Sequence, residues 1–231
     1  MHKLNKDREA SGVVTVDLQQ GGEESRAPRV IMPPYVVLRD FLDEATVAGL
    51  LEYALSRQAD FAPTRLDSMT VNPAVRVSTG LRELGGYRDI LKTKILGLVP
   101  RLISQLQVTP FEKPKLETEL VAHGDGAFYK RHIDTQTAHY EHVNQIRVLS
   151  GVYYFHAEPK AFTGGALRLY AFGGKSSQDF VNIEPVHNNL LVFPSWAPHE
   201  VMPVSCPSKK FVDSRFAINC WVRRRKHDAA T

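Results

Sequence analysis

The residues best able to do chemistry are histidines, and four of the nine in the chain lie between positions 123 and 142. Among these, His132 stands two residues before Asp134. Side chains at positions i and i+2 of a β-strand project from the same face, so both could bind one metal ion. An imidazole and a carboxylate together suit a borderline divalent metal. The pair alone is weak evidence, because chance placement gives roughly half an occurrence in a chain of this composition.

His199 and Arg215, which occur later in the chain, strengthen the metal-site interpretation. His199 follows the apolar run Leu190–Phe193 and a turn, which predicts a position at the end of a strand. With His132 and Asp134 it would place three ligands on one side of a metal and leave other positions open, as in mononuclear non-haem iron(II) oxygenases. Arg215 opens a later apolar strand. A guanidinium directed into a barrel interior needs an anion, and its planar fork suits a carboxylate.

These residues belong to a longer ordered pattern. The chain contains, in order, Gly126, Phe128, Tyr129, His132 and Asp134; Gly164, Gly165 and Leu167; His199, Val201, Pro203 and Val204; and Arg215 and Trp221. In this pattern the segment from about Leu116 to Arg223 resembles the catalytic domain of 2-oxoglutarate- and iron(II)-dependent oxygenases of the prolyl 4-hydroxylase type. With the segment from Tyr35 to Leu42 and the helix after it, the resemblance covers most of the chain after residue 30. It indicates the superfamily and does not select a substrate.

The resemblance implies a role for several residues. It assigns Fe(II) binding to His132, Asp134 and His199. Arg215 would pair with the distal carboxylate of 2-oxoglutarate. Tyr154 matches a strand tyrosine that in some relatives bonds the same carboxylate, and Tyr129 would also lie at the cofactor site.

The activity implied by the resemblance is hydroxylation of an unactivated C–H bond. Oxygen would be the co-substrate, succinate and CO2 the co-products, and ascorbate an additional reductant. The acceptor would be a peptidyl residue, a free amino acid or a small natural product. Desaturation and ring formation use the same oxidant and stay open. Asp134 favours hydroxylation, because related halogenases lack the carboxylate ligand.

Several alternatives remain at this stage. The interval from His199 to Arg215 is longer than in many relatives, which predicts an extra loop at Cys206–Val212. Some relatives carry a cofactor-contacting tyrosine at the position of Ala122, so contacts other than that of Arg215 stay open. Arg215 could instead form a structural salt bridge with Asp213, and Tyr154 could be a core aromatic. His132 with His139 and His142 could suggest a zinc site, although Thr135–Gln145 reads as a loop beside the active-site mouth.

The segments that would position these residues predict an α+β fold. After Pro114, short β-rich runs alternate with Gly, Asn, Pro and Ser, a pattern typical of a β-sandwich or barrel. The predicted strands are Leu116–Ala122, Ala127–Arg131, Val148–Phe155, Ala166–Ala171, Leu190–Phe193 and Phe216–Val222. The resemblance implies that they form a double-stranded β-helix, the jelly-roll or cupin-like core.

Supporting helices are predicted before this β-rich half. Tyr35–Leu38 reads as a strand, and Asp43 could cap a helix that follows it. Apolar spacing predicts a second helix from about Tyr87 to Gln107, which Pro100 should kink or restart. The length of 231 residues is most simply one domain with tails. We expect a mobile tail at 1–28, a single domain at 29–225 with its jelly-roll core from 114, and a short tail at 226–231.

Composition narrows the class of protein. Hydrophobic residues make up 43% and charged residues 23%, close to the average for soluble globular proteins, which excludes wholesale disorder, a collagen repeat and a coiled coil. No stretch approaches the roughly 20 apolar residues of a membrane helix, and the polar start is unlike a secretory signal. Two cysteines, Cys206 and Cys220, are too few for a disulfide scaffold. These features predict a cytoplasmic protein with no membrane partner.

Charge leaves two rival functions open. The formal net charge is +4, and the basic run from Arg223 to Lys226 is read as a solvated tail after the last strand. If that run bound nucleic acid, the protein would be a nucleic-acid-binding module, although no aromatic-basic stripe accompanies it. The other rival is a jelly roll that binds a small acid without turnover. We expect a small-molecule or peptide substrate and no nucleic-acid partner, and the sequence leaves the oligomeric state open.

Overall fold

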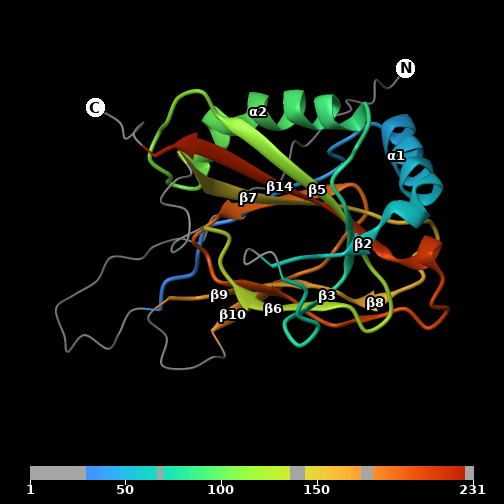
Figure 1. The fold of residues 1–231 in the computed structure, drawn as a ribbon. Coiled ribbons are helices and arrows are strands. Elements are labelled where there is room, and N and C mark those ends of the chain that lie inside the picture. Colours follow the sequence, from blue (N-terminus) through green and yellow to red (C-terminus); the bar gives the residue numbers. More distant parts are fainter. Residues whose placement is uncertain (1–29, 67–69, 136–143, 173–178, 227–231) are drawn as a thin grey trace, which may run out of the picture.

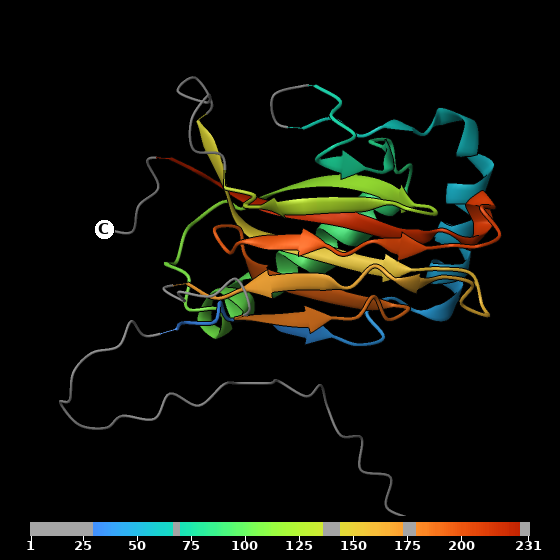
Figure 2. The same ribbon diagram turned by 90° about the horizontal axis from the view of Figure 1, so that it is seen from below.

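A computed structural model describes residues 30–66, 70–135, 144–172 and 179–226. Two antiparallel β-sheets face each other, and two helices cover the outer face of the larger sheet (Figure 1). Figure 2 shows the strands lying side by side, with α1 (Glu44–Ser56) at one end of the sandwich. This arrangement confirms the predicted α+β class. No helix in the described ranges is both long enough and apolar enough to span a bilayer.

The strands form three sheets, and every pairing among the described residues is antiparallel. The seven-stranded sheet has the order β1 (Val36–Leu38), β11 (Asn189–Pro194), β7 (Gln145–Phe155), β14 (Arg215–Arg225), β5 (Lys115–His123), β4 (Thr79–Leu81) and β2 (Ala62–Pro63). The five-stranded sheet has the order β10 (Phe180–Ile183), β9 (Leu167–Tyr170), β12 (His199–Val201), β6 (Phe128–His132) and β3 (Arg76–Val77). A small third sheet pairs β13 (Val204–Ser205) with β8 (Thr163–Gly164).

The two helices form for the reasons that their sequences indicate. α1 spans Glu44–Ser56, and the Asp43 side chain caps it by accepting a hydrogen bond from the Thr46 amide at 2.9 Å. α2 spans Tyr87–Gln105 and ends just before Gln107, whose left-handed φ of 53° no longer fits a helix. α2 continues through Pro100, so this residue does not break it. Short 3-10 turns occur at Gln58–Asp60 and Phe211–Asp213.

All six β-rich runs of the sequence form strands, and one of them corrects the reading of the basic tail. β14 extends through Arg225, three residues beyond the predicted end at Val222. Arg223 pairs with β7 and lies 3.2 Å from a carboxylate oxygen of Glu117. The basic run is therefore largely part of the sheet rather than a solvated tail. It extends because the long partner strand β7 supplies hydrogen bonds as far as Gln145.

The apolar residues divide into two main clusters that hold the layers together. The larger lies between the helices and the seven-stranded sheet and includes Leu50, Leu91 and Leu120. The smaller lies between the two sheets, where Leu169 and Phe193 are fully buried. Polar residues occupy another part of the space between the sheets. The predicted tails at 1–28 and 227–231 lie outside the described residues.

Candidate active site

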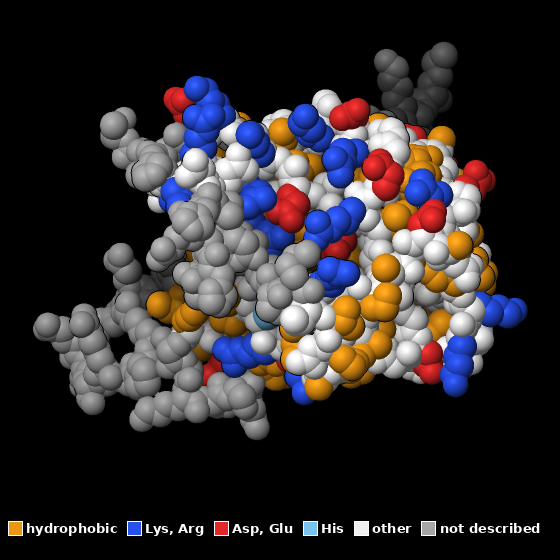
Figure 3. Space-filling view, viewed as in Figure 1, with side chains coloured by type: hydrophobic (Ala, Val, Ile, Leu, Met, Phe, Trp, Pro, Cys, Tyr) orange, Lys and Arg blue, Asp and Glu red, His pale blue; other side chains and the backbone are white. Residues whose placement is uncertain are grey.

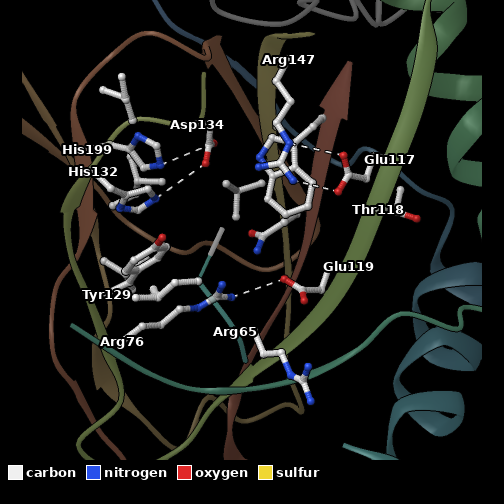
Figure 4. Close-up of a pocket in the computed structure, with 18 of the residues that line it drawn as sticks. Arg65, Arg76, Glu117, Thr118, Glu119, Tyr129, His132, Asp134, Arg147 and His199 are labelled. Carbon is white, nitrogen blue, oxygen red and sulfur yellow. Dashed lines mark hydrogen bonds and ion pairs between the residues drawn. The ribbon is translucent and has the colours of Figure 1, made fainter. Parts of the chain in front are cut away.

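His132, Asp134 and His199 converge on one point between the sheets (Figure 4). His132 ends β6, His199 begins β12, and the two are directly paired across these strands. The Nε2 atoms of both histidines lie 3.7 Å from oxygens of Asp134. One possible ligand atom from each of the three residues lies within 4.8 Å of the others. The structure thus brings together the three side chains predicted as metal ligands.

Backbone carbonyls set the orientation of both imidazoles. The Nδ1 atom of His132 lies 2.8 Å from the Lys130 carbonyl oxygen, and that of His199 lies 2.9 Å from the Ala197 carbonyl oxygen. A carbonyl only accepts hydrogen bonds, so each Nδ1 carries the proton and donates it. The Nε2 atoms then keep free lone pairs on the side of Asp134. This second hydrogen bond is typical of metal-binding histidines.

Serines hold the carboxylate of this group. Ser150 donates a hydrogen bond of 2.6 Å to Asp134 Oδ2, and its hydroxyl also lies 2.9 Å from that of Ser195. The Asp134 amide donates to the Ser195 carbonyl at 2.9 Å, which fixes the backbone as well. These hydrogen bonds therefore fix the position of the Asp134 carboxylate in the site.

Charge and burial favour the protonation states that bind a metal. Burial lowers the pKa of His132 to about 3, with the facing His199 acting in the same direction and Asp134 opposing it. Burial alone would raise the pKa of Asp134, but His199, His132 and the Ser150 hydrogen bond together hold it below its usual range. His132 is thus neutral and Asp134 ionised near neutral pH, as divalent metal binding requires.

Tyr129 lies against the site through a stack of side chains. Its ring stacks on that of His132, with centroids 3.6 Å apart. The guanidinium carbon of Arg76 lies 4.8 Å from the centre of the same Tyr129 ring. Arg76 is in turn held by Ser78 at 3.1 Å and by Glu119 at 3.4 Å. Tyr129 therefore packs against a metal-ligand candidate and lines the cavity, while its place at a cofactor site stays a prediction.

Arg215 brings buried, unpartnered hydrogen-bond donors to the site. Its side chain is 1% exposed, and its Nε and Nη2 atoms are buried without a hydrogen-bond partner among the described residues. The equally buried hydroxyl of Tyr154 also has no partner there, and its ring lies 4.9 Å from the guanidinium carbon. Unsatisfied buried donors of this kind are costly unless a ligand completes them. A carboxylate fits these donors, as the second carboxylate of 2-oxoglutarate would.

Gly165 makes room for this guanidinium. A Cβ atom at position 165 would lie 2.6 Å from Arg215 Cδ, and the backbone has a φ of +71° that favours glycine. The predicted alternative, in which Arg215 pairs with Asp213, does not occur, because the Asp213 carboxylate accepts a hydrogen bond from Ser208 instead. Burial lowers the pKa of Arg215, with Tyr154 opposing this shift, but a guanidinium stays protonated at neutral pH.

His123 is a site residue that the sequence did not reveal. It lies opposite Arg215 in the β5–β14 ladder, and its Nδ1 lies 3.2 Å from Arg215 Nη1. Burial lowers its pKa well below the usual value, and Arg215 and Arg76 act in the same direction. The neutral ring therefore accepts a hydrogen bond from Arg215. Glu117 and Glu119 lie on the same face of β5 as His123, and all three line the cavity. This alternation of polar residues along the strand is the sequence feature that could have indicated His123 as a site residue.

One cavity of about 410 Å³ joins the two ends of the site. It is lined by the three metal-ligand candidates, by Arg215 and by the charged side chains of β5. Opposite the histidines, Glu117 accepts two hydrogen bonds from Arg147, at 2.8 and 3.3 Å (Figure 4). The same guanidinium lies 3.9 Å from the centre of the Trp221 ring. A volume of this size is typical of a small-molecule site.

Some predicted features cannot be placed in the site. His139 and His142, considered for zinc, and most of the predicted loop Thr135–Gln145 lie outside the described residues. The predicted extra loop at Cys206–Val212 contains a buried Cys206, whose amide donates to Asp125 at 2.9 Å. It therefore packs against the turn before β6.

Comparison with known proteins decides the family. A model of the 2OG-Fe(II) oxygenase superfamily matches residues 118–223. An uncharacterised PKHD-type hydroxylase of Synechocystis sp. is 39% identical over 218 residues, covering 92% of this chain and 71% of the relative. The chain belongs to the 2-oxoglutarate- and iron(II)-dependent oxygenase superfamily. The predicted resemblance is thereby confirmed, and the family implies Fe(II) and 2-oxoglutarate as cofactors.

Solved structures support the fold of this oxygenase. A prolyl-4-hydroxylase of Pseudomonas putida aligns with a TM-score of 0.58 and 24% identity, over 83% of this chain and 92% of that chain. A prolyl hydroxylase of Trichoplax adhaerens, in complex with a hypoxia inducible factor peptide fragment, aligns with a TM-score of 0.62 and 22% identity, over 81% and 82% of the two chains. These likenesses confirm the predicted jelly-roll core.

Proposed function

We propose that this oxygenase hydroxylates an unactivated C–H bond of a peptidyl residue, an amino acid or a small natural product, and forms succinate and CO2. The observation that carries the proposal is the pairing, in one cavity, of a His-Asp-His group with a buried anion site at Arg215. The first group has the ligand set of an open iron(II) centre. The second has unsatisfied donors that suit a carboxylate. The prolyl hydroxylase fold of its neighbours favours a peptide among these acceptors.

His132, Asp134 and His199 would hold Fe(II), which when bound supplies the oxidation chemistry with 2-oxoglutarate and oxygen. The chain's own contribution is orientation. The carbonyls of Lys130 and Ala197 keep both Nε2 lone pairs available, and Ser150 keeps the carboxylate in place.

Arg215 would bind the distal carboxylate of 2-oxoglutarate through Nε and Nη2, because its Nη1 already donates to His123. The Tyr154 hydroxyl would donate to the same carboxylate. Burial raises the pKa of Tyr154 to about 12, so the hydroxyl keeps its proton at neutral pH. The two residues thus combine one charge with several fixed donors.

The test is anaerobic addition of Fe(II) and 2-oxoglutarate, followed by visible spectroscopy for a metal-to-ligand charge-transfer band. We expect the wild-type protein to form the band. His132→Ala should abolish it, and Arg215→Ala should require more 2-oxoglutarate. No band in protein that demonstrably binds iron would contradict the proposal and favour a binder without turnover.

Turnover is then tested in air by measuring succinate. Candidate acceptors should stimulate succinate formation, and a mass increase of one oxygen atom in the acceptor would identify hydroxylation. A mass decrease of two hydrogens would instead identify desaturation or ring formation. If succinate never exceeds that of His132→Ala with any acceptor class or without acceptor, the proposed activity is wrong.

A further inference from the structure

Arginines dominate the charge of the cavity. Six line it, namely Arg65, Arg76, Arg82, Arg88, Arg147 and Arg215, against three carboxylates, from Glu117, Glu119 and Asp134. The cavity therefore has an excess of three positive charges. Fe(II) and 2-oxoglutarate carry equal and opposite charges, so their binding would leave this excess unchanged. Figure 3 shows Lys and Arg side chains gathered near the centre of the face viewed there, with a few acidic side chains among them.

Two of these arginines pair with carboxylates inside the site, and a third has a proposed cofactor partner. Arg76 bonds to Glu119 at 3.4 Å, Arg147 bonds to Glu117 at 2.8 Å, and Arg215 is the proposed cofactor anchor. The positive charges of these three arginines are therefore balanced by protein carboxylates or by the proposed cofactor. The excess resides in the other three, Arg65, Arg82 and Arg88, which we call the mouth arginines.

The mouth arginines are exposed and lack carboxylate partners. In the described part of the chain, no Asp or Glu oxygen lies within 4.0 Å of their guanidinium nitrogens. The nearby Glu83 carboxylate instead accepts a hydrogen bond from the Gly85 amide at 3.2 Å. Figure 4 shows Arg65 beside the cavity wall formed by Glu119.

The place of Arg88 in its helix is electrostatically unfavourable. Arg88 lies in the first turn of α2, where the helix dipole disfavours a positive charge. The guanidinium of Arg88 donates a hydrogen bond to the Arg82 carbonyl at 3.2 Å. This hydrogen bond holds the Arg88 guanidinium beside the backbone of a second arginine. Folding alone does not explain this arrangement, whereas binding an anion would.

The neighbouring sheet edge favours an extended peptide as that anion. β4 pairs with β5 only at Leu120–Ala122, so β5 has no strand on this side from Lys115 to Glu119 among the described residues. An unpaired edge can bind an added strand through backbone hydrogen bonds. Thr118 and Glu119 on this edge line the cavity, and Arg82 directly follows the last paired residue of β4.

We propose that the substrate is an acidic peptide segment, whose carboxylates bind Arg65, Arg82 and Arg88 while the chain lies along the open edge of β5. The proposal rests on the proposed hydroxylase function, since it names the substrate class of the same cavity. It predicts that acidic residues flank the hydroxylated residue.

The test compares three fluorescein-labelled peptides, Glu-Ala-Pro repeated four times and its Gln-Ala-Pro and Lys-Ala-Pro counterparts. Binding is measured by fluorescence anisotropy under anaerobic conditions with Fe(II) and 2-oxoglutarate. An exposed ion pair changes affinity by a factor of about two to five, so three together should give about tenfold or more. We expect the Glu peptide to bind at least about tenfold more tightly than the Gln peptide, and the Lys peptide most weakly.

Two triple variants separate the mouth arginines from general charge. The mouth variant combines Arg65→Gln, Arg82→Gln and Arg88→Gln. The control variant combines Arg39→Gln, Lys92→Gln and Arg101→Gln, which remove the same charge from exposed positions outside the cavity. Only the mouth variant should lose the preference for the Glu peptide. Equal losses in both variants, or equal binding of the Glu and Gln peptides by the wild-type protein, would overturn the proposal.

The charge-transfer band is recorded for the same samples, so that failure of the cofactor site is distinguished from failure of this inference. Both variants should keep the wild-type band. Anisotropy is repeated without metal or 2-oxoglutarate. This measures peptide binding to the mouth arginines even if the charge-transfer band is absent. An oligothymidylate probe is included. If it binds more tightly than the Glu peptide and depends on the same three arginines, the partner is a nucleic acid and the acidic-peptide proposal is wrong.

Discussion

Two groups of side chains in the described chain have the types and distances of a metal site, and they differ in the orientation of one imidazole. The first is His132, Asp134 and His199, and the second is His156, Glu158 and His187. In the first, both Nδ1 atoms donate to backbone carbonyls, so both Nε2 atoms have free lone pairs. Each of the two imidazoles carries its proton on Nδ1, the nitrogen that faces away from the possible ion.

The second group lacks this arrangement. His187 Nδ1 accepts a hydrogen bond from the His156 amide at 3.2 Å, so a neutral His187 carries its proton on Nε2. Neither nitrogen of that ring then has a lone pair for a metal. The Glu158 side chain is also 67% exposed, and none of the three residues lines the cavity. The comparison shows that the second hydrogen bond of each imidazole, more than ligand spacing, distinguishes the two groups.

The largest predicted effect is a direct test of this difference. His132→Ala should weaken iron binding by more than about a hundredfold, because loss of even an outer partner of a ligand typically costs 10–100-fold. His187→Ala should leave both the affinity and a stoichiometry of one iron per chain unchanged. Anaerobic iron titration of the two variants measures both quantities. A second equivalent of iron that disappears in His187→Ala would show that the comparison is wrong.

Removal of the serine that holds Asp134 should have the next largest effect. Ser150→Ala deletes the 2.6 Å hydrogen bond to the carboxylate and should weaken iron binding by about 10–100-fold. Ser56→Ala is a matched control, because Ser56 also donates to an acceptor in the chain but lies on α1, outside the cavity. Equal iron affinities of Ser150→Ala and Ser56→Ala would mean that Asp134 needs no such support.

The anion site proposed at Arg215, in the same cavity as the first group, is tested by a substitution that displaces Arg215 without removing it. Gly165→Ala would place a Cβ against Arg215 Cδ and should raise the 2-oxoglutarate concentration for half-maximal band formation about tenfold or more. Gly97→Ala on α2 meets nothing within 4 Å and should leave it unchanged. Iron affinity measured without 2-oxoglutarate should stay at the wild-type value in both. Unchanged 2-oxoglutarate dependence in Gly165→Ala would argue against Arg215 as the anchor.

The smallest predicted effect concerns the pH dependence of stability. Burial holds the pKa of His123 well below its usual value of 6.5, so below about pH 6.5 the unfolded chain takes up a proton that the folded chain does not. The free energy of unfolding of the wild-type protein should therefore fall as the pH decreases from 6.5. His123→Asn keeps an acceptor for Arg215 but does not titrate, so its slope should be smaller by up to about 1.4 kcal/mol per pH unit.

Urea unfolding of both proteins at several pH values between about 4.5 and 7.5 measures this difference. His132 and His156 also have lowered pKa values, so the variant should keep part of the wild-type slope. Identical slopes in the two proteins would mean that His123 is protonated in the folded state, which contradicts its role as an acceptor for Arg215.

Much of the fold was predictable because it is encoded over short distances along the chain. Apolar patterns located both helices and seven strands, including β1 at the predicted run Tyr35–Leu38, and the side chain of Asp43 caps α1 as its type predicts. The short strands β2, β3 and β4 were not predicted, because they lack an apolar run such as the one at Tyr35–Leu38 that indicated β1. They form because strands distant in the chain or already paired supply their hydrogen bonds: β4 pairs with β5, β2 with β4, and β3 with β6.

The sequence by itself determined the metal-ligand candidates His132, Asp134 and His199, the anion candidate Arg215 and the family, because ligand types and motif order are local properties. The tertiary structure alone decided that His123 faces Arg215, that the basic run joins β14, and that the mouth arginines share the cavity. It also decided which imidazole nitrogens carry protons. These features depend on strand register and on hydrogen bonds between segments far apart in the chain, which local patterns do not specify.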